Sequence, residues 1–165
     1  MASIESTAEA GARRVLLFRA AGRLCACDLD AVREIVNGRP STRLPGTPAW
    51  VDGLINVRGT LVTVVDLAVR FGATRGAEAQ GSIVIVQGAG KVFGMRVDGV
   101  RDVRTLAPDA LEPVDAQRDA GGVVMALAHV DAHGGAEGGE SALLCDIEAI
   151  AREALAVQDG TTTHG

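Results

Sequence analysis

Two histidines near the end of the chain have a spacing that metal sites use. His129 and His133 are four residues apart, with Asp131 between them, and on a helix this spacing places two ligands on one face. Here, however, His129 ends a strand-like run and His133 opens a Gly-rich stretch, and no Glu follows His129 as a metalloprotease requires. The pattern therefore favours solvated loop histidines over metal ligands.

The three cysteines are the other candidates for metal or redox chemistry. Cys25 and Cys27 lie two residues apart in a strand-like run, which places both thiols on one face. A structural zinc site needs four ligands, so Cys145 and a distant histidine would have to complete one. Burial of the thiols as small apolar groups is the favoured interpretation. An odd number of cysteines without a secretory signal also predicts reduced thiols in a cytoplasmic protein.

Nucleotide binding and nucleophilic catalysis find little support in the sequence. Residues 88–91, Gly-Ala-Gly-Lys, lack the earlier glycine and the final Ser or Thr of a phosphate-binding loop, and a strand-like run follows them instead of a helix. The serines, Ser141 among them, lie in no nucleophile-elbow motif, and no Ser–His pairing is predicted. We therefore predict a hairpin turn at 88–91 and name no catalytic residues.

Composition excludes further classes of protein. The chain has 165 residues, of which 47% are hydrophobic and 22% charged, as in ordinary globular domains. A formal net charge of −5 and 2% aromatic residues argue against nucleic-acid binding, which uses basic surfaces and aromatic stacking. No apolar run approaches the roughly 18 residues of a membrane span. The composition predicts an acidic, soluble, cytoplasmic domain with no direct membrane insertion.

The elements that must position these residues are mostly short strands. Runs rich in Val, Ile and Leu recur at roughly the 8–12-residue spacing of small sandwiches and barrels. Gly-containing pairs such as Ala21-Gly22 separate them and predict tight turns. Near the C-terminus, residues 147–157 place apolar side chains on one helical face and predict a helix.

A weak internal echo links the two halves of the chain. Residues 60–71 and 142–153 both run from a strand-like segment through Asp-Leu or Asp-Ile into a helical pattern. Two related halves, each a small barrel, would explain the repeat. The ends, residues 1–12 and 158–165, are small and polar and predict flexible tails. Residues 13–157 are then one domain of two intertwined barrel subdomains.

The most informative stretch is residues 44–71. Its prolines, Pro45 and Pro48, bracket a rigid connection that Trp50 is expected to anchor against the core. A strand (GLINV), a tight turn at Arg58-Gly59 and a returning strand are predicted to follow.

The pattern P-A-W-V-x-G-L-I-N-V-R-G-x-L-V-x-V-V-D-L in this stretch resembles the signature of the CheW-like chemotaxis coupling domain, and pattern-level matches extend over about residues 13–157. The resemblance implies two small five-stranded β-barrels packed together, with a C-terminal helix, and neither enzymatic activity nor a cofactor. Members of this family are adaptors that join the cytoplasmic tips of chemoreceptors to the regulatory domain of the histidine kinase CheA.

The same resemblance implies a partner-binding site. By this resemblance, the residues near the family's receptor-binding groove are Val32, Glu34, Gly53, Asn56 and Arg58. Of these, Glu34 and Arg58 are candidates for an ion pair across the groove. Cytoplasmic membrane-receptor arrays are the implied location, reached through the partners.

Two departures from the family pattern leave other functions open. Thr63 stands where the family usually has Pro, and the Gly-rich loop 131–140, expected to be mobile and dispensable for folding, is longer than usual. One alternative is a CheW-like adaptor in a kinase pathway other than chemotaxis. A second is a small metal- or ligand-binding protein that uses His129, His133 and Cys145.

Overall fold

Two β-sheets make up most of the molecule, a computed structural model that describes residues 12–74, 81–114, 122–130 and 139–154. The first sheet has six strands in the order β8-β1-β2-β11-β10-β9, and the second has five in the order β3-β6-β7-β5-β4. The strands of the first sheet are β1 Arg13–Ala20, β2 Arg23–Asp28, β8 Gly99–Leu106, β9 Leu111–Pro113, β10 Val124–Val130 and β11 Glu140–Cys145. Those of the second are β3 Val32–Asn37, β4 Val51–Val57, β5 Thr60–Asp66, β6 Ser82–Gly88 and β7 Lys91–Val97.

The helical elements are short. Two 3-10 turns, η1 Leu29–Ala31 and η2 Pro108–Ala110, lead into strands, and α2 Leu67–Arg70 follows β5. Residues 147–154 form the C-terminal helix, so the predicted helix is present where the chain is described, and residues 155–157 lie outside that part. Among the described residues, no helix is long and apolar enough to span a membrane.

Two-residue turns of one kind close the hairpins β1–β2, β4–β5 and β6–β7. Each turn has a non-glycine residue followed by glycine, both with positive φ, which is the twist that joins antiparallel strands directly. The turn pairs are Ala21-Gly22 (φ 56° and 73°), Arg58-Gly59 (51° and 85°) and Ala89-Gly90 (52° and 75°). The turns that the glycine pattern predicts are therefore present, including the hairpin at 88–91.

The two sheets repeat one topology. Strands β8, β1, β2, β11 and β10 of the first sheet correspond in order to β3, β6, β7, β5 and β4 of the second. In both series three neighbouring pairs are antiparallel, and the pair β2–β11 or β7–β5 is parallel. The short β9 is an addition to the first series. The predicted mostly-β fold of two similar subdomains with a C-terminal helix is confirmed.

The sequence echo marks equivalent places in this repeat. Asp66 is the last residue of β5 and caps α2, its Oδ1 accepting the Val69 amide at 3.2 Å. Asp146 follows β11 and caps the C-terminal helix, its Oδ1 accepting the Ala149 amide at 3.1 Å. Strands β5 and β11 are also equivalent in pairing, since β5 pairs in parallel with β7 and β11 with β2. In both halves, an aspartate therefore caps the helix that follows the equivalent strand.

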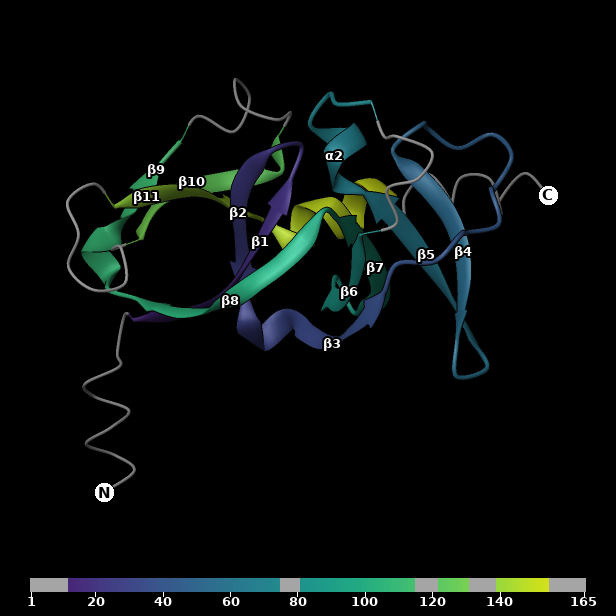
Figure 1. Cartoon of the computed structure of the whole chain (residues 1–165), viewed down its shortest axis with the longest axis horizontal. Coiled ribbons are helices and arrows are strands. Elements are labelled where there is room, and N and C mark those ends of the chain that lie inside the picture. Colours follow the sequence, from purple (N-terminus) through teal and green to yellow (C-terminus); the bar gives the residue numbers. More distant parts are fainter. Residues whose placement is uncertain (1–11, 75–80, 115–121, 131–138, 155–165) are drawn as a thin grey trace.

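The largest core lies between the sheets. Figure 1 shows the C-terminal helix, in yellow, between the strands of the two sheets. Its apolar face and the facing sides of both sheets form one buried cluster, the inter-sheet core, whose members include Phe18, Cys27, Val65, Val84, Phe93, Met95, Cys145, Ile147, Ile150, Ala151 and Ala154. Smaller clusters fill the other side of each sheet. The sheets therefore share a core that neither encloses alone.

Candidate partner-binding site

The tip of the β4–β5 hairpin, residues 56–61, presents the most exposed of the predicted site residues. Arg58 occupies the first position of the two-residue turn, where its positive φ turns the side chain out from both strands. The side chain of Asn56 closes the turn, because its Oδ1 accepts the Gly59 amide at 2.8 Å. Local hydrogen bonding thus fixes the position from which Arg58 projects.

An ion pair joins this tip to the opposite edge of the same sheet. Strands β3 and β4 are the two edge strands of the second sheet, yet Arg58 Nη1 donates to Glu34 Oε2 of β3 at 2.5 Å. The Arg58 side chain is 77% exposed and that of Glu34 27% exposed. A pair in this environment stabilises the fold by at most about 1 kcal/mol. Its main effect is to hold the curved sheet edges together at the surface.

The 38–50 segment, which connects β3 to β4, covers the free edge of β4. Thr42 and Leu54 exchange two backbone hydrogen bonds of 2.8 Å each. Gly53 permits this approach: it has a φ of 142°, and a Cβ built on it would lie 2.2 Å from the Thr42 carbonyl oxygen. No side chain fits in that space, so Gly53 is required for the segment to reach β4.

A buried ion pair fixes the same segment from beneath. Arg96 of β7 and Asp52 of β4 lie 2.9 Å apart, with side chains only 4% and 8% exposed. Asp52 Oδ2 also accepts the Ser41 hydroxyl at 2.6 Å, and Arg96 Nη2 donates to the Arg39 carbonyl at 2.6 Å. These bonds hold both ends of residues 39–41 against the sheet.

Large apolar side chains of the second sheet are also exposed to solvent. Ile35 of β3 is 45% exposed and Leu61 of β5 is 65% exposed. In the sequence, Leu61 is indistinguishable from Val62, which follows it and is buried. The predicted β4–β5 hairpin places Leu61 near the tip, opposite Asn56, and the two residues differ because Val62 points into a core cluster. Exposed side chains of this size are suited to contact with another protein.

A family model describes nearly all of the chain. The model of the CheW-like domain matches residues 14–155. This chain belongs to the CheW-like domain family. Proteins similar to it include a probable chemotaxis protein CheW of Rhizobium etli, which is 34% identical over 104 residues, covering 62% of this chain and 67% of the relative.

Other similar proteins extend the range of CheW-like relatives. Protein PilI of Pseudomonas aeruginosa is 32% identical over 84 residues, covering 50% of this chain and 47% of that protein. The crystal structure of the scaffolding protein TtCheW from Thermoanaerobacter tengcongensis superposes with a TM-score of 0.70 at 26% identity, covering 82% of this chain and 90% of that one. The CheW-like fold therefore extends over both sheets.

Within this CheW-like domain, the five predicted site residues have different environments. Glu34, Asn56 and Arg58 come together at the hairpin tip and the facing edge of β3. Val32 lies two residues before Glu34 on β3 and packs half-buried against the inter-sheet core. Gly53 is buried under the 38–50 segment, where its structural role is evident. The sequence analysis did not identify Asp52. Its only signal was Arg96, an arginine inside an apolar strand, because a buried arginine needs a buried acidic partner.

Of the alternative metal-binding residues, His129 and Cys145 lie apart from one another. His129 lies in β10 opposite Ser141, whereas Cys145 lies at the other end of the same strand pair, opposite Val124, and is buried. His133 lies outside the described residues, as does the 131–138 part of the Gly-rich loop. No cluster of three or more His, Cys, Asp or Glu side chains suited to a metal ion occurs in the part of the chain that the structure describes.

One expectation about His129 is wrong. It lies in β10, in agreement with the strand-like run, but it pairs with a serine. Ser141 Oγ is 3.3 Å from His129 Nδ1, and Glu112 Oε2 is 3.1 Å from His129 Nε2. The pairing of β9, β10 and β11 makes these three residues neighbours on an exposed sheet surface, a relation that the spacing of the residues in sequence does not show.

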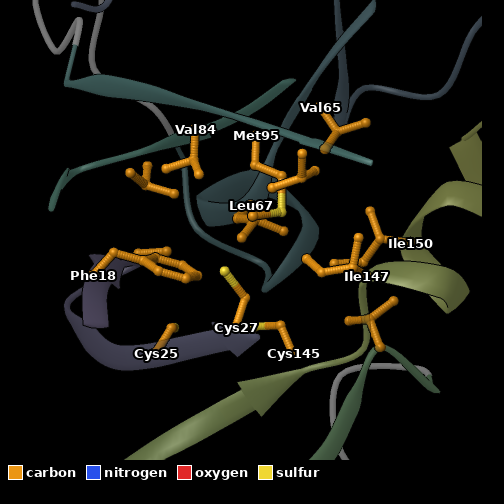
Figure 2. Packing of buried hydrophobic residues seen from close by; sticks show 14 of the residues in the cluster. Phe18, Cys25, Cys27, Val65, Leu67, Val84, Met95, Cys145, Ile147 and Ile150 are labelled. Carbon is orange, nitrogen blue, oxygen red and sulfur yellow. The ribbon is translucent and has the colours of Figure 1, made fainter. Parts of the chain in front are cut away.

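The three cysteines gather in the inter-sheet core, as Figure 2 shows, where Cys25, Cys27 and Cys145 lie together below Leu67 and Met95. All three are buried free thiols, which confirms their interpretation as apolar core residues. Burial, followed by the neighbouring Asp28 and Cys25, raises the pKa of Cys27 to about 12. A side-chain hydrogen bond with Cys25, together with burial, raises the pKa of Cys145. Both thiols are therefore protonated and unreactive at neutral pH.

Alkaline solution is expected to destabilise the fold through these thiols. In the unfolded chain Cys27 ionises near its usual pKa of 9.0, whereas in the folded chain it stays protonated until about pH 12. The unfolded state therefore binds fewer protons in this window, and the free energy of unfolding decreases as pH rises from 9 toward 12. Chemical denaturation of the parent and of Cys27→Ala across this range checks the slope. An equal slope in the two proteins would contradict the assignment to Cys27.

Proposed function

We propose that this chain is a non-enzymatic adaptor that couples chemoreceptors to a CheA-type histidine kinase. The observation that carries the proposal is the match of the CheW-like family model along residues 14–155. Relatives named as chemotaxis proteins and a structural relative named as a scaffolding protein support the same function. The adaptor acts in the cytoplasm, beside the receptor tips. It needs no cofactor, since its function is to bind.

The proposed binding surface is centred on the hairpin tip. Arg58 offers a planar set of N–H donors, of which one is used by Glu34, to carboxylates or helix-end carbonyls of a partner. Leu61 supplies an exposed apolar contact from the same tip. Val32 and Glu34 extend this surface onto β3, and Asn56 keeps the turn in shape. Together these residues suit a partner helix with one apolar and one acidic position.

Reversing the charge at Arg58 is expected to separate binding from folding. Arg58→Glu removes no core packing, so the free energy of unfolding should change by no more than about 1 kcal/mol. The new carboxylate would repel both Glu34 and an acidic partner, and binding should weaken about tenfold or more. Circular dichroism melts and pull-downs with the co-encoded kinase and a receptor-tip fragment measure the two effects on one preparation.

Arg14→Glu is the matched control, because Arg14 is an exposed arginine of β1 in the other sheet. It should leave both partner interactions unchanged. If a well-folded Arg58→Glu protein binds like the parent, Arg58 lies outside the interface. If the parent itself captures neither partner, the adaptor proposal fails.

A second candidate is an adaptor of the same kind in another kinase pathway. The similarity to Protein PilI of Pseudomonas aeruginosa, a CheW-like relative with a different name, favours keeping it. Both candidates place the same residues in contact with a partner. Capture of a co-encoded kinase that is paired with receptors of another system would select the second candidate.

A further inference from the structure

We propose that Arg39 is a positioning residue, which connects the buried Asp52–Arg96 pair to the hairpin tip and thereby sets the orientation of Arg58. The inference deepens the proposed function and rests on it for the identity of the binding surface. The inference is drawn from a series of hydrogen bonds through the 38–50 segment, in which each residue binds the one that follows it in the series. None of these bonds involves the ion pair between Glu34 and Arg58 itself.

The first hydrogen bonds of this series are held rigidly, because they are buried. Arg96 lies on β7, the central strand of the second sheet, and is 3% exposed. Its guanidinium donates through Nη2 both to Asp52 Oδ2 at 2.9 Å and to the Arg39 carbonyl at 2.6 Å. The Arg39 backbone is therefore bound to the middle of the sheet, although Arg39 belongs to a connecting segment.

The next hydrogen bonds of the series connect Arg39 to the hairpin tip. Arg39 Nη1 donates to the Asn56 carbonyl at 3.3 Å, and Arg39 Nε to the Asn37 carbonyl at 3.5 Å. Asn37 ends β3 and Asn56 lies one residue before the end of β4, so one guanidinium bridges the two edge strands. The Asn56 side chain in turn accepts the Gly59 amide. Arg39 therefore holds the backbone of Asn56, and the side chain of Asn56 shapes the turn that carries Arg58.

Arginine is suited to this role by its geometry. A planar guanidinium presents several N–H donors in fixed directions, so it can satisfy two carbonyls at once, whereas a lysine ammonium is a flexible point charge. The carbonyls of edge strands otherwise point to solvent, and the tip could move relative to β3. Holding the tip before a partner arrives lowers the ordering cost of binding.

The test compares Arg39→Ala with the parent, and uses Arg14→Ala as the matched control for loss of one exposed arginine. NMR measures amide exchange of Gly59 and Thr60, at the tip, and of Val84 and Val86, in the core. Arg39→Ala should speed exchange at the tip about fivefold and leave the core amides unchanged. Binding to the regulatory domain of the co-encoded kinase and to a receptor-tip fragment should weaken about fivefold for at least one of them, to a similar degree at 50 and 300 mM NaCl, since a positional effect is not screened by salt.

Each other outcome overturns the inference. Weaker binding with unchanged tip exchange would make Arg39 a direct contact of the partner. Faster exchange in the core as well as the tip would make it a general structural residue. Unchanged exchange and binding would remove it from the site. If the parent binds neither partner, the adaptor proposal fails, yet tip exchange still shows whether Arg39 positions the hairpin.

Discussion

Replacing Ile150 by Asp is expected to lower the free energy of unfolding by about 4 kcal/mol or more. Ile150 is 1% exposed and lies on the C-terminal helix, where it packs in the inter-sheet core with residues of both sheets. In Figure 2 it projects from the helix toward the core beside Ile147. An aspartate there would place a carboxylate among apolar side chains and remove the contacts that the isoleucine makes with both sheets.

The measurement is equilibrium denaturation followed by circular dichroism. Arg152→Gln is the control, because Arg152 is an exposed residue of the same helix and its replacement should cost less than about 0.5 kcal/mol. Two successive unfolding transitions, one for each sheet, would show that the two sheets no longer unfold as one cooperative unit. If the Ile150→Asp protein unfolds at the same denaturant concentration as the parent, the helix does not join the sheets as described.

Removing one member of the buried ion pair is expected to have the next largest effect. Asp52→Ala leaves the Arg96 guanidinium buried without its carboxylate, and such changes cost about 3–5 kcal/mol. Ser41 would lose one of its acceptors but keep the Asp52 carbonyl, 3.0 Å away. The loss should therefore come mainly from the uncompensated charge, and thermal or urea denaturation would measure it.

A double variant separates that charge from simple loss of packing. Asp52→Ala combined with Arg96→Met removes both charges of the pair, so that apolar contact can replace the ion pair. We expect the double variant to regain at least half of the stability that Asp52→Ala loses. A double variant less stable than Asp52→Ala alone would show that Arg96 stabilises the fold chiefly through other contacts, such as its bond to the Arg39 carbonyl.

Local features of this fold could be predicted because they depend on neighbouring residues. A residue and a glycine between two strand-like runs predict a two-residue turn with positive φ angles, so the turns at Ala21, Arg58 and Ala89 were identifiable. The aspartates that cap α2 and the C-terminal helix belong to a repeated pattern. The apolar face of the C-terminal helix likewise follows from its periodicity.

The site depended on contacts between residues far apart in the chain. His129, Ser141 and Glu112 gave no sign of their proximity, because the pairing of β9, β10 and β11 alone brings them together. Exposure of Leu61 beside a buried Val62 likewise depends on tertiary packing, because neighbouring residues of a strand point to opposite faces of the sheet and Val62 is covered by a core cluster. The Glu34–Arg58 pair was named from the resemblance and is present, whereas the role of Asn56 in shaping the turn and the role of Gly53 beneath the 38–50 segment were not predicted.

Sequence patterns were enough to predict the turns, the many strands, the C-terminal helix and membership of the CheW-like family, since each depends on local conformational preference or on a contiguous motif. Tertiary contacts were needed to reveal that Asp52 and Arg96 form the buried pair beneath the 38–50 segment, and that Gly53 permits the close approach of that segment to β4. Those outcomes depend on which chain segments lie side by side. Free energies of burial and pairing between distant residues select that arrangement, and no residue carries them alone.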